Sequence, residues 1–171
     1  MISRNDIIGY YNGNNFRNVV LEDILKMFED KLMIDVVELP ARYNSQMDNK
    51  SLIKKQSVNS FVNSFISSQR RAIPNKIAIP LTIDSTAYGI INELIEGKIK
   101  NLKEVTPVKG KVIKPLYLFL DKEVLLYAKL KKLKFKKIKK EETKISKFID
   151  DLEKKHPEVK RAVVNSLINK K

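Results

Sequence analysis

Two short loops hold residues that could bind a phosphate or a metal ion. The first lies between an apolar run and an amphipathic stretch and consists of Tyr11, Asn12, Gly13, Asn14, Asn15 and Phe16. A glycine-containing loop that leads into a helix can hold phosphate on its backbone N–H groups, although an ordinary strand–helix turn explains this sequence equally well. The second loop contains Pro80, Leu81, Asp84 and Ser85. There, Asp84 could help to hold Mg²⁺.

Basic residues form a third group with a possible binding role. The formal net charge is +14, and residues 101–171 hold 21 basic against 9 acidic side chains. The excess is centred on residues 129–140, here called the basic segment, whose 8 lysines are Lys129, Lys131, Lys132, Lys134, Lys136, Lys137, Lys139 and Lys140. A localised positive field favours a polyanionic partner, nucleic acid first and anionic membrane second, although lysine-rich composition can also serve solubility. The interleaved apolar residues can fix this segment to the core while the ammonium groups face outward.

The residue types that are absent exclude several kinds of chemistry. The chain has no cysteine and a single histidine, His156. Disulfides, thiolate metal clusters and cysteine nucleophiles are therefore excluded, and a histidine-based metal site is implausible. We expect no metal and no other cofactor. The sequence has no signal-peptide pattern, and no window approaches the ~18 apolar residues of a membrane span, so we expect a cytoplasmic protein without a membrane partner.

Alternating apolar runs and amphipathic stretches predict the elements that position these loops. Strands are predicted over 7–11, 34–39 and 76–81, and stripes at helical spacing follow them over 20–28, 58–66 and 87–95. Strands that look buried, in β–α order, predict an α/β fold: a Rossmann-like, mostly parallel sheet with helices on both faces. Stripes over 145–152 and 159–168 predict C-terminal helices. We expect one domain over 1–171, with a core over 1–128 and the basic segment and C-terminal helices over 129–171.

A junction of strand and helix organises the chain around residue 121. Residues 112–120 are apolar, β-branched or aromatic and predict a strand, and the spacing of the next residues predicts a helix. Asp121 is the expected N-cap of that helix, as Asp84 or Ser85 is of the helix over 87–95. Pro115 lacks a backbone N–H, which favours an outer strand or a bulge.

Three segments of this sequence resemble motifs of the PP-loop ATP pyrophosphatase family. Residues 11–16 lie where that family carries Ser-Gly-Gly-Lys-Asp-Ser. Residues 77–87 and 94–97 resemble its Gly-His-Asn-Leu-Asp-Asp segment and a following Leu-x-x-Gly. Residues 112–116 with 122–128 are similar to the Ile-Arg-Pro-Leu and Lys-Glu-Ile…Tyr-Ala segment of the tRNA 2-thiouridine synthetase branch, and this match is the most specific.

At the positions of the family's chemical groups, this sequence carries other residues. One glycine and the lysine, aspartate and serine of the phosphate loop are replaced by Asn12, Asn14, Asn15 and Phe16. In the second motif the glycine and histidine positions are Pro80 and Leu81, and Asp84 remains of the acidic pair. Arg70-Arg71 resembles the basic pair that follows the synthetase's Cys-x-x-Cys, yet no thiol precedes it here.

The residues that serve ATP, sulfur and metal in the synthetases are missing together from this chain. In this respect the chain resembles the cytosolic thiouridylase subunit 2 family, in a compact archaeal-type version. The resemblance implies a degenerate synthetase fold without catalysis of its own. It also implies two partners: tRNA, and a catalytic thiouridylase subunit of the same fold that thiolates the wobble uridine U34, paired as a heterodimer or heterotetramer. We expect the tRNA contacts at Arg70, Arg71 and the lysines of the basic segment.

Two other functions remain open from the sequence. One is a nucleotide-dependent transferase, in which Gly13, Asn14 and Asn15 still hold phosphate and Asp84 helps to hold Mg²⁺. The other is a general RNA- or ribosome-associated basic protein on an old nucleotide-binding scaffold. Nucleotide titration would separate the first of these from the rest.

Overall fold

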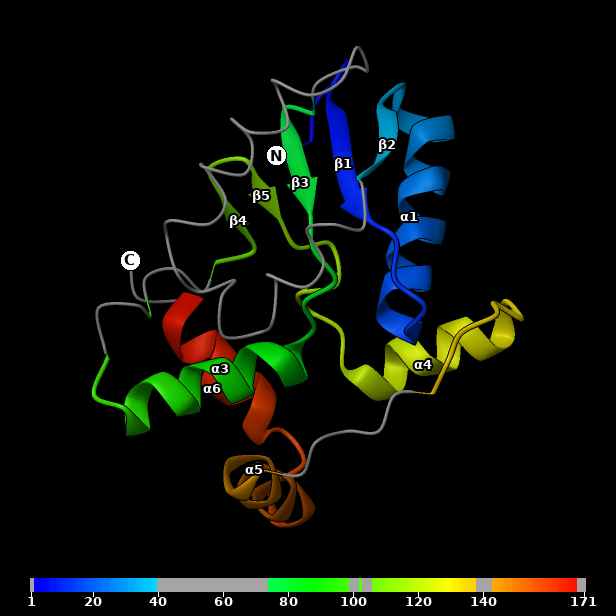
Figure 1. Cartoon of the computed structure of the whole chain (residues 1–171). Coiled ribbons are helices and arrows are strands. Elements are labelled where there is room, and N and C mark those ends of the chain that lie inside the picture. The colour runs from blue at the N-terminus through cyan, green and yellow to red at the C-terminus, as the bar shows by residue number, and fades with distance from the viewer. Residues whose placement is uncertain (1, 40–73, 99–101, 103–105, 138–142, 169–171) are drawn as a thin grey trace.

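A computed structural model of the chain describes residues 2–39, 74–98, 102, 106–137 and 143–168 (Figure 1). In chain order its elements are β1 (Ile7–Tyr11), α1 (Phe16–Leu32), β2 (Asp35–Leu39), β3 (Lys76–Ala78), α3 (Ile83–Ile95), β4 (Val108–Lys109), β5 (Val112–Ile113), α4 (Asp121–Leu130), α5 (Lys144–Lys155) and α6 (Val159–Ile168). The predicted helix over 58–66, Arg70, Arg71, Lys139 and Lys140 lie outside the described residues.

The five described strands form one sheet in the order β2-β1-β3-β5-β4. All neighbouring pairs are parallel except β4 and β5, which pair antiparallel. The predicted α/β class with a mostly parallel sheet is thus confirmed. Because β1, β3 and β5 run the same way, the loops that follow them meet at one end of the sheet, the lower end in Figure 1.

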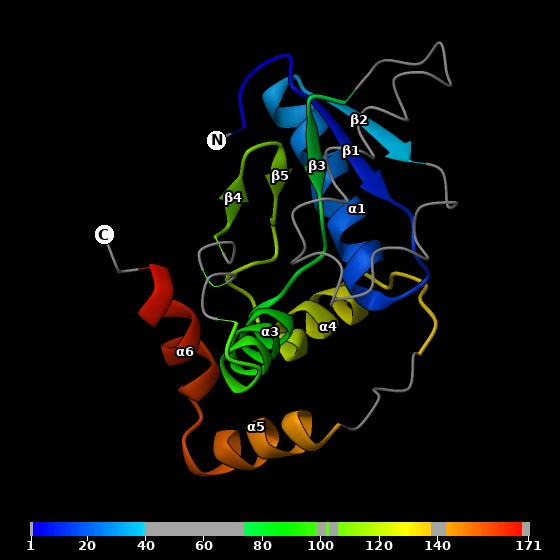
Figure 2. The same cartoon turned by 60° about the vertical axis from the view of Figure 1, so that its left-hand side comes forward.

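Among the described residues, two apolar cores hold the elements together. The first joins the sheet to α1 and α4 and includes Ile8, Leu21, Leu25 and Val124. The second joins α3 to α6 and includes Ile90 and Val164, together with Tyr117 and Leu120 from the chain before α4. Figure 2 shows α3 and α6 next to each other, with α5 below them. In the described part of the chain, no helix is both long and apolar enough to cross a membrane.

The structure corrects the prediction of a continuous strand over 112–120. The strand ends at Ile113, and two successive turns follow, closed by Tyr117 N–H donating to Lys114 O and Phe119 N–H donating to Leu116 O. Pro115 lacks the N–H that would continue the ladder, and the apolar residues beyond it lie in turns. The unpredicted strand β4 pairs with β5 and forms the outer strand of the sheet.

Both predicted helix caps are also corrected. Thr82 caps α3, and its hydroxyl accepts a hydrogen bond from Ser85 N–H, so neither Asp84 nor Ser85 is the cap. Asp121 is the first residue of α4 and follows Leu120 at the cap position. The Asp84 side chain accepts a hydrogen bond from the first N–H of α4 instead of one from its own helix, and the partners of Asp121 are described below.

Candidate nucleic-acid interface

The first loop is held by two asparagines, Asn15 in the loop and Asn18 on α1. The Asn15 side chain caps α1 by accepting a hydrogen bond from Asn18 N–H at 2.9 Å. The Asn18 side chain donates to Tyr11 O at 3.0 Å, and a Cβ on Gly13 would lie 2.6 Å from its Nδ2 atom. A side chain at position 13 would clash with the Asn18 amide, so a glycine there has a structural explanation that involves no phosphate.

The second loop places Asp84 against the C-terminal helices. One oxygen of the Asp84 carboxylate accepts from Asp121 N–H at 2.7 Å, and the other accepts from Lys160 Nζ at 2.6 Å. Lys160 is 5% exposed and also contacts Glu153 at 2.5 Å. Burial acts to lower the pKa of Lys160, but the hydrogen bonds to Asp84 and Glu153 outweigh it and raise the pKa. Lys160 thus neutralises Asp84, the residue that the sequence suggested could help to hold Mg²⁺.

Asp121 links the beginnings of three helices. Its carboxylate accepts hydrogen bonds from Arg17 Nε at 2.7 Å and from the Thr82 hydroxyl at 2.7 Å, and a second Arg17 nitrogen also donates to it. Arg17 lies in the first turn of α1, and Thr82 caps α3. The helix N-termini at the carboxyl end of the sheet are therefore joined by side chains of the protein, with Asp84 and Asp121 supplying the negative charge that helix N-termini favour.

The described part of the basic segment runs beside the first loop. Lys132 has a positive φ of 54°, which ends α4 and turns the chain back toward α1. Leu133 and Phe135 then pack against the first core, and the Phe135 ring lies edge-on to Phe16 with centroids 6.3 Å apart. Lys136 N–H donates to Asn14 O at 2.6 Å. These contacts fix the backbone of the segment next to the loop.

The lysines of this region face solvent. Six are described and all are exposed: Lys129, Lys131, Lys132, Lys134, Lys136 and Lys137. Leu130 is 75% exposed and so does not help to fix the segment, in contrast to Leu133 and Phe135. The result is a ridge of one charge sign on a backbone held in place, a surface suited to the phosphates of a nucleic acid.

The comparisons with known proteins support the fold. No family model and no curated protein matches the chain. The structure resembles that of the U34-tRNA thiolase NcsA from Methanococcus maripaludis with its [4Fe-4S] cluster, with a TM-score of 0.69 and 18% sequence identity. The alignment covers 96% of this chain and 71% of that chain. At this identity the likeness establishes the shared fold.

This comparison contradicts the prediction that the protein is not an enzyme. That prediction rests on the replaced loop residues and the missing thiols, but the solved structure that shares the fold belongs to a thiolase, which is an enzyme. Its cluster does not fit the residues of this chain, because iron–sulfur clusters are held mainly by cysteine thiolates and the sequence contains none. The replaced loop residues therefore do not decide whether the chain takes part in catalysis.

Proposed function

We propose that the protein is a subunit of a complex that thiolates U34 of tRNA, in which it binds tRNA and supports a thiouridylase chain of the same fold. The observation that carries this proposal is the ridge of exposed lysines held beside the first loop by Leu133, Phe135 and the Lys136–Asn14 hydrogen bond. The shared fold with a U34-tRNA thiolase supports the choice of tRNA over other polyanions.

The composition favours a second chain in this complex. A thiolation that uses cysteine thiolates or an iron–sulfur cluster needs cysteines, and this sequence has none. A partner that carries them would supply those groups, as a heterodimer or heterotetramer. Chains of the same fold can pair about a pseudo-twofold axis.

The ridge would position tRNA by its backbone. Lysine delivers a compact charge without the planar geometry that reads base edges, so its contacts are expected at phosphates. Selection of the target uridine would then rest with the site that modifies it. Binding should accordingly depend strongly on salt and weakly on the tRNA sequence.

The first test changes Lys134, Lys136 and Lys137 together to glutamine. We expect affinity for all tRNAs to fall alike, and the slope of log K against log salt to flatten by roughly 0.7 to 0.9 for each phosphate that the variant no longer neutralises. The matched control also changes three exposed lysines to glutamine, and so alters the net charge equally. These are Lys144, Lys154 and Lys155 of α5. Equal slopes for the two variants would show that the ridge is only a solvated surface.

The second test is co-expression with the cysteine-bearing chain of the same fold from the same genome. The two proteins should elute together from a sizing column at micromolar concentration. Separate elution, together with equal binding to unrelated RNA, would favour a general RNA-binding protein. A saturable stabilisation by Mg²⁺-ATP would favour the nucleotide-dependent transferase.

A further inference from the structure

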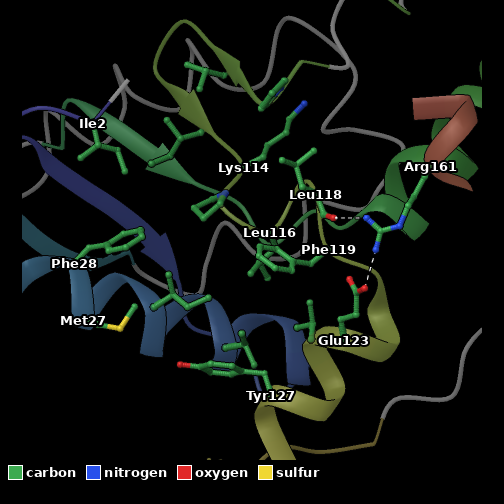
Figure 3. Close-up of a pocket in the computed structure, with 17 residues that line it drawn as sticks. Ile2, Met27, Phe28, Lys114, Leu116, Leu118, Phe119, Glu123, Tyr127 and Arg161 are labelled. Atoms are coloured by element: carbon green, nitrogen blue, oxygen red, sulfur yellow. Dashed lines mark hydrogen bonds and ion pairs between the residues drawn. The ribbon is translucent and has the colours of Figure 1, made fainter. Parts of the chain in front are cut away.

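An apolar groove of about 730 Å³ lies on the side of the molecule that carries α1 and α4 (Figure 3). One wall is formed by α1 and α4, and the β4–β5 hairpin with the chain that follows it forms the other. The floor includes the buried side chains of Ile113, Leu116 and Val124. The basic segment begins next to the groove: Tyr127 lines the groove, and the Lys131 ammonium lies over the Tyr127 ring, 5.9 Å from its centroid.

Large apolar side chains remain exposed along the groove. Met27 on α1 is 37% exposed, Val108 on β4 is 44%, and Leu118 and Phe119 are 57% and 49%. A small ligand within the groove would contact only the inward parts of these side chains. A helix laid along the groove would cover both the floor and the outward parts of these side chains, and burial of apolar surface favours association. The distribution of exposure therefore favours a segment of a macromolecule.

The charges on the two walls differ. The hairpin region, residues 106–114, carries three lysines and no acidic residue: Lys109, Lys111 and Lys114. On the opposite wall, Glu123 lines the groove and accepts from Arg161 at 2.7 Å, and Asp23 of α1 accepts from the Tyr127 hydroxyl at 2.7 Å. Figure 3 shows Arg161 reaching Glu123 and the Leu118 carbonyl at one end of the groove.

We propose that this groove binds an amphipathic helix of a partner protein, with an apolar face toward the groove and acidic residues along its flank. An apolar helix face laid in a hydrophobic groove is a common recognition mode, and acidic flanking residues would complement the hairpin lysines. A second copy of this chain is disfavoured, because it would bring another +14 of charge and the same basic hairpin to the contact. The proposal goes beyond a role in tRNA binding and does not depend on it.

The probe is a synthetic helix with leucines at i, i+3, i+4 and i+7, glutamates on both flanks and one tryptophan. This chain contains no tryptophan, so the peptide alone gives that fluorescence signal. We expect saturable micromolar binding that Phe119→Glu weakens at least tenfold. Phe148→Glu, at a 54% exposed phenylalanine on α5, is the control and should leave the affinity unchanged. A lysine-flanked peptide should bind at least tenfold more weakly.

Several results would overturn the proposal. These are absence of saturable binding, equal affinity of wild type and Phe119→Glu, or equal affinity for the two peptides. A further test measures the molar mass in solution by light scattering. If the wild type is a dimer and Phe119→Glu is a monomer, the groove binds a second copy of the chain. If Phe119→Glu does not fold, Met27→Glu makes the same test from the opposite wall, where Met27 lines the groove.

Discussion

Lys160 shows how a single residue can connect distant parts of this chain. It lies on α6, yet its ammonium group binds Asp84 at the start of α3 and Glu153 on α5. A nearly buried cation requires compensation of this kind, because an unpaired charge in the interior is costly. Asp121 plays a comparable part for Arg17 and Thr82. These pairs tie the C-terminal helices and the helix N-termini to the end of the sheet.

Replacing Lys160 with methionine should destabilise the protein. The change removes the counter-charge of Asp84 and Glu153, and we expect a loss of roughly 2 to 4 kcal/mol in the free energy of unfolding, measured by urea denaturation. Lys154→Met is the control, since Lys154 pairs with Asp151 in an exposed position on α5. Equal midpoints for both variants would mean that the Lys160 contacts contribute little.

Asp6 gives a prediction about pH. Hydrogen bonds from Lys76 and from Ser3 N–H lower the pKa of the Asp6 carboxyl below its ordinary value of 3.8. A lowered pKa in the folded state contributes stability that is present above the unfolded pKa and lost as pH falls through the folded pKa. Asp6→Asn should therefore be less stable than wild type at pH 7, and the gap in stability should narrow progressively as the pH falls below about 4. Thermal melts between pH 7 and pH 3 measure this gap, and a gap independent of pH would contradict the assignment.

At the scale of elements, periodicity predicted those with long, regular patterns. The strands over 7–11 and 34–39 and the helices at 145–152 and 159–168 correspond to β1, β2, α5 and α6, because each has an apolar pattern set by local spacing. The prediction of a strand over 112–120 was wrong beyond Ile113, because apolar turns can have the same composition as a buried strand. Only the lack of an N–H at Pro115 signalled the break.

The packing of Phe135 determines how the basic segment is held. Phe135→Ala should cost roughly 1 to 3 kcal/mol in stability, because the ring is partly buried against Phe16, and should weaken tRNA binding by freeing the lysines. Leu130→Ala is the control, at an exposed position on the same segment. Urea denaturation and tRNA titration are the measurements. Unchanged affinity in a destabilised Phe135→Ala would show that the lysines bind without a fixed backbone.

The parts of the candidate site that are marked by local sequence composition could be predicted. The parts that depend on contacts between residues far apart in the chain could not. The first loop and the basic segment stand out as short runs of unusual composition. Arg17 and Lys160 gave no such signal, since their partners Asp121 and Asp84 lie 104 and 76 residues away along the chain. From the sequence alone, a charged residue on a helix is expected to face solvent, because its partner is known only from the fold.

At the scale of the whole molecule, the two cores share a boundary. Leu120 belongs to the second core and directly precedes α4, whose Val124 belongs to the first. Thr82 and Asp121 are hydrogen bonded across the same boundary. Because these contacts join the cores, we expect them to unfold as one cooperative unit.

Val164→Ala tests this cooperativity. Val164 on α6 is almost fully buried against α3, and its truncation should cost roughly 2 kcal/mol. If the cores unfold together, hydrogen exchange in the EX2 regime should show the most protected amides of α1 and α3 losing equal free energy. Loss of protection confined to α3 and α6 would show that the cores unfold separately.

The brevity of β4 has a consequence for behaviour at high concentration. A long outer strand offers its unpaired N–H and C=O groups to strands of other molecules and can seed fibres. β4 has two residues, and the hairpin turns at Gly110, whose φ is 55°, between Lys109 and Lys111. In the part of the chain that the structure describes, the sheet ends on this side in a short strand whose last residue is Lys109. A strand of another molecule could pair with few free N–H and C=O groups of β4, so fibrillar aggregation should not start there.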